Sequence, residues 1–185
     1  MSVFNSLYSF KNYVIGCSNE FAYTCAHTIA EEPGAIYNPL FIYGETGTGK
    51  THLLNAMGLY IQEHNPDMRI LYMTAEQFVK EIVDSIRVGT VEEMDKKYIE
   101  ADVLMIDDVQ FIAGKEATQE EFFRILDLVY SKNKQIILAS DTGSHRIQDL
   151  KRRIYAQFMR GVVVELKLPN DEATFKGGLE YGKEN

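Results

Sequence analysis

Cysteine, positive charge and long apolar runs are all scarce in this chain of 185 residues. Its two cysteines, Cys17 and Cys25, form no CxxC pair and have no histidine at metal-ligand spacing, so we expect buried, reduced thiols. No stretch approaches the ~18 apolar residues of a membrane span, and residues 1–10 lack the basic-then-apolar order of a secretory signal. These absences predict a cytoplasmic protein with no membrane contact.

Basic residues are outnumbered by acidic ones. The chain carries 19 of the former and 27 of the latter, a net charge of −8, which argues against a protein that neutralises nucleic-acid phosphates over its whole surface. The exception is the segment 146–160, where five basic residues and one acid give +4. This segment is a nucleic-acid contact, a phosphate contact to a neighbouring subunit, or a solvated helix face, and the solvated face is the default interpretation.

Length and composition indicate one α/β domain. At roughly 150 residues per domain there is no room for a second lobe, and 45% apolar residues suffice for a packed core. Short apolar runs alternate with longer helical patterns, which is typical of a parallel sheet covered on both faces. The expected strands are 39–43, 69–73, 101–106, 135–139 and 162–166, and the expected helices are 18–31, 51–63, 76–87, 118–131 and 144–158.

The strongest motif follows the first expected strand. Residues 44–51 match the pattern Gly-x-x-x-x-Gly-Lys-Ser/Thr in full, between a strand and a helix. Backbone N–H groups of such a loop and the N-terminal end of the helix face nucleotide phosphates, the lysine adds a charge, and the threonine hydroxyl ligates Mg²⁺. A ligand-free glycine turn is the alternative, which the strand-to-helix setting disfavours. The predicted nucleotide contacts are Glu45, Thr46, Gly47, Thr48, Gly49, Lys50, Thr51 and His52, with Thr51 as a metal ligand.

Two carboxylates end the third expected strand. Asp107 lies 57 residues after Lys50, Asp108 follows it, and four apolar residues precede the pair. Open α/β sheets bind ligands at this end of their strands. We expect Asp107 to hold Mg²⁺ through water and Asp108 to polarise the attacking water. Solvated acids at a strand end are the alternative, which the accompanying P-loop disfavours.

Ser140 and Asp141 follow the fourth expected strand. In a P-loop fold with an inserted strand, a polar residue here reaches between the two motifs and senses the γ-phosphate. Either residue is a candidate, and a plain helix cap or turn residue is an equal alternative.

Together these residues resemble the AAA+ nucleotide-binding domain of the DnaA family of bacterial replication initiators. The similarity covers about residues 6–170 and includes the P-loop region 37–54, the acidic motif with the segment after it at 106–123, and residues 10–22. It implies a P-loop sheet of five parallel strands in the order 5-1-4-3-2, with helices on both faces. It further implies ATP or ADP with Mg²⁺ as ligands, self-assembly, and a role in initiating or regulating chromosomal DNA replication.

The resemblance also assigns residues that the motifs do not. It makes 1–17 a leading segment that borders the adenine, with Ile15 and Asn19 as contacts, and 18–170 the AAA+ domain. It makes Asp141 the first sensor, and it maps single-stranded DNA contacts to Val79 and Lys115. Residues 171–185, rich in glycine and polar, are expected to fray.

This chain departs from the family pattern where catalysis needs a cation. The arginine finger position is occupied by Gln157, and a finger is worth about 10³ to 10⁵ in rate in other nucleotidases. In the family a helical lid and a helix-turn-helix follow the position of Pro169, and we expect neither in residues 170–185. We therefore expect slow ATP hydrolysis or none, and weak binding of single-stranded DNA. The alternatives are a non-hydrolysing regulatory module that contacts a replication protein, and a relative of the helicase loaders.

Overall fold

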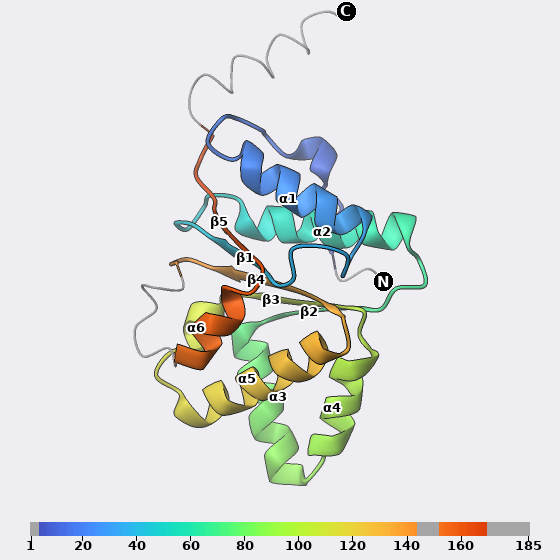
Figure 1. Ribbon diagram of the computed structural model, residues 1–185, viewed down its shortest axis with the longest axis vertical. Coiled ribbons are helices and arrows are strands. Elements are labelled where there is room, and N and C mark those ends of the chain that lie inside the picture. The colour runs from blue at the N-terminus through green and yellow to red at the C-terminus, as the bar shows by residue number, and fades with distance from the viewer. Residues whose placement is uncertain (1–3, 144–151, 170–185) are drawn as a thin grey trace, which may run out of the picture.

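A five-stranded parallel sheet forms the centre of the computed structural model, which describes residues 4–143 and 152–169 (Figure 1). Its strand order is β2-β3-β4-β1-β5, which is the expected 5-1-4-3-2 counted from the other edge. The strands are β1 (Leu40–Tyr43), β2 (Ile70–Thr74), β3 (Val103–Asp107), β4 (Gln135–Ser140) and β5 (Val162–Glu165).

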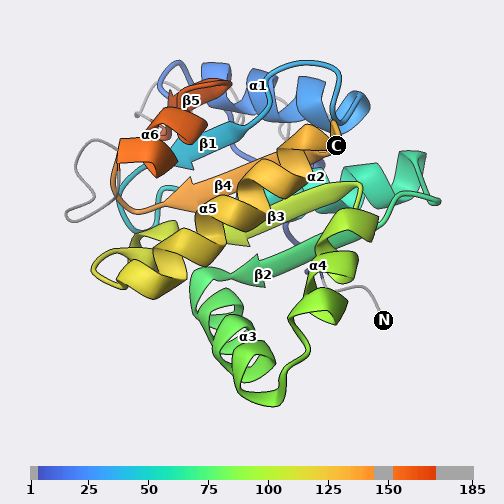
Figure 2. The ribbon, with the colours of Figure 1, turned by 60° about the horizontal axis from the view of Figure 1, so that its bottom comes forward.

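The helices cover both faces of the sheet (Figure 2). The helices α1 and α2 lie on one face, and α3 to α6 lie on the other (Figure 1). The α-helices are α1 (Glu20–Glu31), α2 (Lys50–His64), α3 (Ala75–Val88), α4 (Val91–Glu100), α5 (Glu116–Ser131) and α6 (Arg152–Phe158), and the short 3-10 helices are η1 (Phe10–Asn12) and η2 (Val109–Ile112).

Alternation along the strands divides the core into two layers. In β1, Leu40 and Ile42 pack with α1 and α2, whereas Phe41 points to the other face and stacks on Phe158 of α6 at 4.7 Å between ring centroids. All residues of β3 and β4 are buried. Because β3 and β4 are covered on both faces, their polar residues have to lie at the strand ends. The candidate functional site is at the carboxyl ends of these strands.

Two expectations need correction, and two others fall wholly or partly outside the described residues. No helix was expected at 91–100, where α4 stands: only Met94 and Tyr98, one turn apart, are buried, and its charged face conceals this narrow stripe. Cys25 is buried as expected, but Cys17 is exposed, because it precedes α1 in the leading segment. Of the helix expected at 144–158, the part before Arg152 lies outside the described residues, as does the expected tail 171–185. No described helix is long and apolar enough to cross a membrane.

Candidate functional site

The P-loop turns from β1 into α2 through glycines that no other residue could replace without strain. Gly47 and Gly49 have φ values of 86° and 99°, in the left-handed region. A Cβ on Gly44 would lie 2.1 Å from the carbonyl oxygen of Leu166, which follows β5. These three glycines therefore determine the path of the loop into α2, and Gly49 is the N-cap of the helix.

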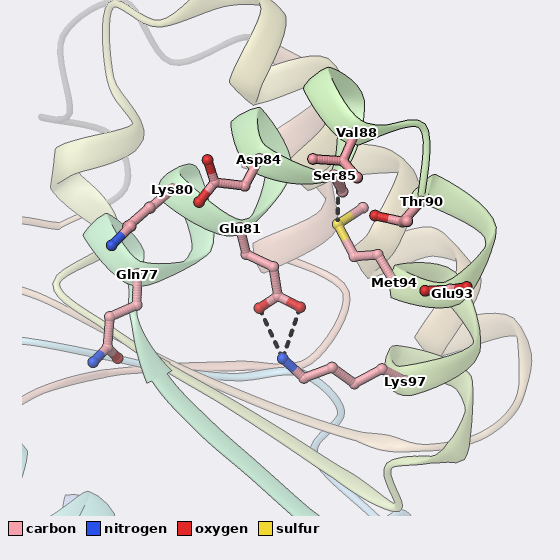
Figure 3. A pocket seen from close by; sticks show the side chains of 10 residues that line it. All are labelled: Gln77, Lys80, Glu81, Asp84, Ser85, Val88, Thr90, Glu93, Met94 and Lys97. Carbon is pink, nitrogen blue, oxygen red and sulfur yellow. Dashed lines mark hydrogen bonds and ion pairs between the residues drawn. The ribbon is translucent and has the colours of Figure 1, made fainter.

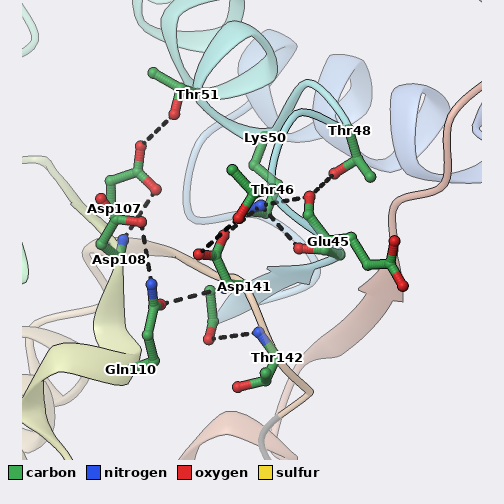
Figure 4. Close-up of polar contacts among 12 residues, drawn as sticks. Glu45, Thr46, Thr48, Lys50, Thr51, Asp107, Asp108, Gln110, Asp141 and Thr142 are labelled. Carbon is green, nitrogen blue, oxygen red and sulfur yellow. Dashed lines mark hydrogen bonds and ion pairs between the residues drawn. The ribbon is translucent and has the colours of Figure 1, made fainter.

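Lys50 is the charge at the centre of this loop. Its side chain is buried, and Nζ donates to the carbonyl oxygens of Gly44 and Glu45 at 2.8 and 3.0 Å (Figure 4). Nζ also lies 2.7 Å from Oδ1 of Asp141. The ammonium thus has a partner for each of its three donors, and a phosphate that binds Lys50 has to compete with Asp141.

Thr51 and Asp107 meet at the first turn of α2. The Thr51 hydroxyl donates to Oδ2 of Asp107 at 2.8 Å, and the Tyr72 hydroxyl donates to the same oxygen at 3.5 Å. Burial raises the pKa of the Asp107 carboxyl. The hydrogen bond from Thr51 lowers this pKa in part, and the neighbouring Asp108 charge raises it further. Burial and the Asp107 charge raise the pKa of Tyr72 to about 12, so its hydroxyl remains a donor. A hydroxyl and a carboxylate side by side are oxygen ligands that fit Mg²⁺.

Asp108 adopts a backbone conformation that few residues tolerate. Its φ of 59° and ψ of 41° lie in the left-handed region, where aspartate and asparagine are the commonest residues after glycine. Its N–H donates to Oδ1 of Asp107 at 2.9 Å, so the first carboxylate holds the turn that aims the second. Strain of this kind at a non-glycine residue is concentrated at functional sites.

Of the two candidate sensors, Asp141 is the one whose side chain reaches the P-loop. Its Oδ2 accepts a hydrogen bond from the Thr46 hydroxyl at 3.2 Å, and its Oδ1 pairs with Lys50. Ser140 is fully buried, and its hydroxyl accepts the N–H of Thr142 at 3.2 Å, while its contact with the P-loop is through the backbone carbonyl, which accepts the N–H of Gly44 at 3.2 Å.

Lys50, Thr51, Asp108 and Asp141 line one cavity of about 540 Å³, within the size range of small-molecule sites, whereas Asp107 contacts it through Thr51 and is not among the lining residues. Two predicted contacts, Glu45 and Thr48, are not among the residues that line it. The Thr48 hydroxyl instead donates a hydrogen bond to the Glu45 carbonyl oxygen at 2.8 Å. The lining residues are Tyr8, Thr46, Gly47, Gly49, Lys50, Thr51, His52, Asp108, Phe111 and Asp141.

The leading segment is fastened beside this cavity. Asn19 is buried, accepts the N–H of Gly16 at 2.7 Å and donates to the carbonyl of Val14 at 2.9 Å, so it shapes the turn that carries the exposed Ile15. Ile15 and Asn19 do not line the cavity, and their contact with adenine stays a prediction.

His52 is in contact with two aromatic rings of the leading segment. Its ring lies 5.0 Å from that of Tyr8 and 5.1 Å from that of Tyr13, measured between centroids. Its Nε2 is 3.0 Å from the carbonyl oxygen of Ser9. The first turn of α2 is thereby connected to the segment that precedes the domain.

Four residues at the site were not singled out from the sequence: Tyr8, Tyr72, Gln110 and Phe111. Tyr8 and Phe111 line the cavity, Tyr72 contacts Asp107, and Gln110 contacts Asp108. Tyr8 and Tyr72 lie far from the motifs in the chain, so no local pattern points to them. Gln110 and Phe111 lie two and three residues after Asp108, and that proximity was the available signal.

A second cavity, of about 560 Å³, is slightly larger but holds none of the motif residues. It lies between α3 and α4 (Figure 3), where Lys97 pairs with Glu81 at 2.7 Å. Its lining has three acidic and two basic side chains, which does not favour phosphate. The chemistry therefore assigns the candidate site to the P-loop cavity.

The predicted DNA contacts lie on elements that pack together. Val79 is on α3 and partly buried, and Lys115 is exposed at the N-cap of α5. The basic segment is partly neutralised in its described part, because Arg153 pairs with Glu120 and Arg160 lies 3.6 Å from Asp127. This supports the interpretation of a solvated helix face.

Gln157, at the predicted finger position, is enclosed. It is 1% exposed, and its amide nitrogen has no hydrogen-bond partner in the described part of the chain. A buried neutral side chain at this place presents no cation to a neighbouring subunit.

Comparison with known proteins gives a consistent result. A family model described as the bacterial DnaA ATPase domain matches residues 4–165. The chromosomal replication initiator protein DnaA of Nautilia profundicola is 47% identical over 165 residues, which cover 89% of this chain and 37% of that protein. The chain thus spans about two fifths of the length of the curated relatives it matches.

Solved structures agree with the sequence comparison. Domain III of the Thermotoga maritima replication initiation protein DnaA superimposes with a TM-score of 0.90 and 38% identity, covering 100% of this chain and 78% of that one. A replication initiator DnaA bound to AMPPCP and single-stranded DNA gives a TM-score of 0.89 and 37% identity, covering 100% of this chain and 58% of that one.

Proposed function

Since the chain belongs to the family of bacterial DnaA ATPase domains, we propose that it binds ATP and ADP with Mg²⁺ and acts in the initiation or regulation of chromosomal DNA replication in the cytoplasm. The observation that carries the proposal is the convergence of Lys50, Thr51, Asp108 and Asp141 on one cavity. A related DnaA was solved with AMPPCP, an ATP analogue, which supports an adenine nucleotide as the ligand.

In this proposal the P-loop residues bind the phosphates of the nucleotide, and the acidic residues position Mg²⁺ and the attacking water. The N–H groups of the loop and the N-terminal end of α2 face the phosphates, and Lys50 exchanges Asp141 for a phosphate oxygen. Thr51 and Asp107 are the residues that would hold Mg²⁺, which would neutralise phosphate charge when bound. Asp108, which lines the cavity, would orient the attacking water.

A non-hydrolysing module is the second candidate, and Gln157 favours it. A buried amide supplies no charge to a developing transition state in a neighbouring site. Nucleotide would then control contacts with a second copy or with a replication protein. Both candidates need the same nucleotide site, and the rate of turnover distinguishes them.

Calorimetric titration with ATP and with ADP, followed by a turnover assay on the same sample, tests the proposal. We expect both nucleotides to bind, more tightly with Mg²⁺ present. Turnover should be slow, and its rate per molecule should not change with protein concentration, because no finger acts between subunits. Absence of nucleotide binding would contradict the proposal, and turnover that rises steeply with concentration would contradict the role given to Gln157.

We also propose weak contact with single-stranded DNA at Val79 and Lys115, since a DnaA bound to such DNA has the same fold. For two or three phosphate contacts, filter binding of an oligonucleotide should weaken about tenfold between about 50 and about 200 mM salt. Lys115→Ala should weaken binding further, whereas Lys132→Ala, at the opposite end of α5, should not. Tight, salt-resistant binding to a duplex would contradict this assignment.

A further inference from the structure

Gln110 bridges the ends of two neighbouring strands beside the P-loop cavity (Figure 4). Its amide nitrogen donates to Oδ1 of Asp108 at 3.3 Å, and its amide oxygen accepts the backbone N–H of Asp141 at 3.2 Å. An ionised carboxylate can only accept and a backbone N–H can only donate, so the partners determine which end of the amide faces which strand. An amide satisfies both partners at once.

The left-handed conformation of Asp108 makes this bridge possible. Directly after Asp108 the chain enters η2, which folds it back over the end of β3. Gln110 can then reach the carboxylate two residues before it and the turn after β4 together. The strain at Asp108 and the bridge from Gln110 are therefore parts of one local arrangement.

Asp141 connects this bridge to the phosphate-binding side of the cavity. Its carboxylate pairs with Lys50 at 2.7 Å and accepts from Thr46 at 3.2 Å. A phosphate that takes over the Lys50 ammonium has to loosen the contact with Asp141. Because Gln110 accepts the N–H of the same Asp141, any movement there acts directly on the group that holds Asp108.

We propose that Gln110 is a positioning residue for ATP hydrolysis, which keeps the Asp108 carboxylate aligned with Asp141 and hence with the phosphate held by Lys50. The inference rests on the proposed function, because it requires that the cavity binds ATP. A glutamine with a structural role alone would affect folding stability and would leave the reaction of the folded protein unchanged.

Two substitutions separate these roles. In Gln110→Glu the side chain keeps its length and still accepts the N–H of Asp141, but it has no proton to donate to Asp108. The charged groups around it are Asp107, Asp108 and Asp141, which favour its protonated form, and Lys50, which opposes that. Gln110→Ala removes both bonds at every pH. The control Gln62→Glu adds the same charge on an exposed turn near the other end of α2.

The readouts are ADP affinity, the rate of a single ATP turnover, and the gain in ADP affinity on adding aluminium fluoride, which imitates the transferred phosphate. Both Gln110 variants should bind ADP within about twofold of the parent, within about 0.4 kcal/mol. At about pH 8 both should turn over ATP at least about tenfold more slowly and lose the gain from aluminium fluoride. Lowering the pH toward about 6 should restore the glutamate variant and not the alanine variant, because a protonated carboxyl donates the missing bond.

Several outcomes would overturn the inference. These are parental rates in both variants, a rate loss matched by an equal loss of ADP affinity, absence of recovery at lower pH, or the same loss in Gln62→Glu. A parent that binds ADP but neither turns over ATP nor responds to aluminium fluoride would also overturn it, while leaving the nucleotide site intact. A parent that binds no nucleotide would instead overturn the proposed function.

Discussion

Lys50→Ala should lower the affinity for ATP by at least about 100-fold, the largest effect we expect from a single substitution. Hydrogen bonds to charged groups contribute about 1.5–3 kcal/mol each, and about 2.7 kcal/mol corresponds to 100-fold. The alanine variant also leaves the Asp141 carboxylate and two carbonyl oxygens facing the phosphates without the ammonium between them. Titration calorimetry of the purified variant with ATP and Mg²⁺ measures the loss.

A matched control removes a lysine and its ion pair elsewhere. Lys134 lies 2.5 Å from Asp102, at the end of the sheet away from the P-loop. Lys134→Ala should keep parental ATP affinity, and thermal melting of both variants shows whether each is folded. ATP binding by Lys50→Ala as tight as that of the parent would place the nucleotide elsewhere on the molecule.

Asp108→Asn should slow ATP turnover at least about 100-fold while changing ATP affinity by no more than about threefold. General bases contribute about 10² to 10⁴ in rate, and an amide cannot accept the proton of the attacking water. Asparagine has the shape of aspartate and tolerates the left-handed backbone at φ 59°, so the turn should survive. A single-turnover assay with protein in excess over ATP detects even a slow reaction.

Asp102→Asn is the control for this substitution, since Asp102 is an acid just before the same strand but pairs with Lys134 outside the cavity. Its turnover should equal that of the parent. An unchanged rate in Asp108→Asn would assign the water to another group. An equal loss of ATP affinity and rate would show that Asp108 contributes to binding instead.

The sheet and the two motifs could be predicted from the sequence because both depend on short, local patterns. Five apolar runs became strands, and Gly47 and Gly49 of the P-loop have the positive φ angles that glycine tolerates. The helix α4 was missed because its buried side is two residues wide within a charged segment. An apolar stripe this narrow can be recognised as the buried face of a helix only when the element that packs against it is known.

The contacts that tune the site could not be predicted, because they depend on packing between distant segments. Tyr72 reaches Asp107 from a neighbouring strand, and Tyr8 reaches His52 from the leading segment. The bridge made by Gln110 depends on a backbone angle at Asp108 that the residue type permits and does not demand. The motifs thus predicted the residues of the candidate site, and not the residues that pack around them.

The ring of Tyr8 against His52 has a practical consequence for optical measurements. The chain has no tryptophan and 11 tyrosines, so its ultraviolet emission comes from tyrosine, and Tyr8 lies at the P-loop cavity itself. Phe111 lines the same cavity and is 46% exposed, so an indole introduced there by Phe111→Trp would be the single such group in the protein. Excited at the red edge of its absorption, it would report ligand entry without background from the tyrosines and without a label on the nucleotide.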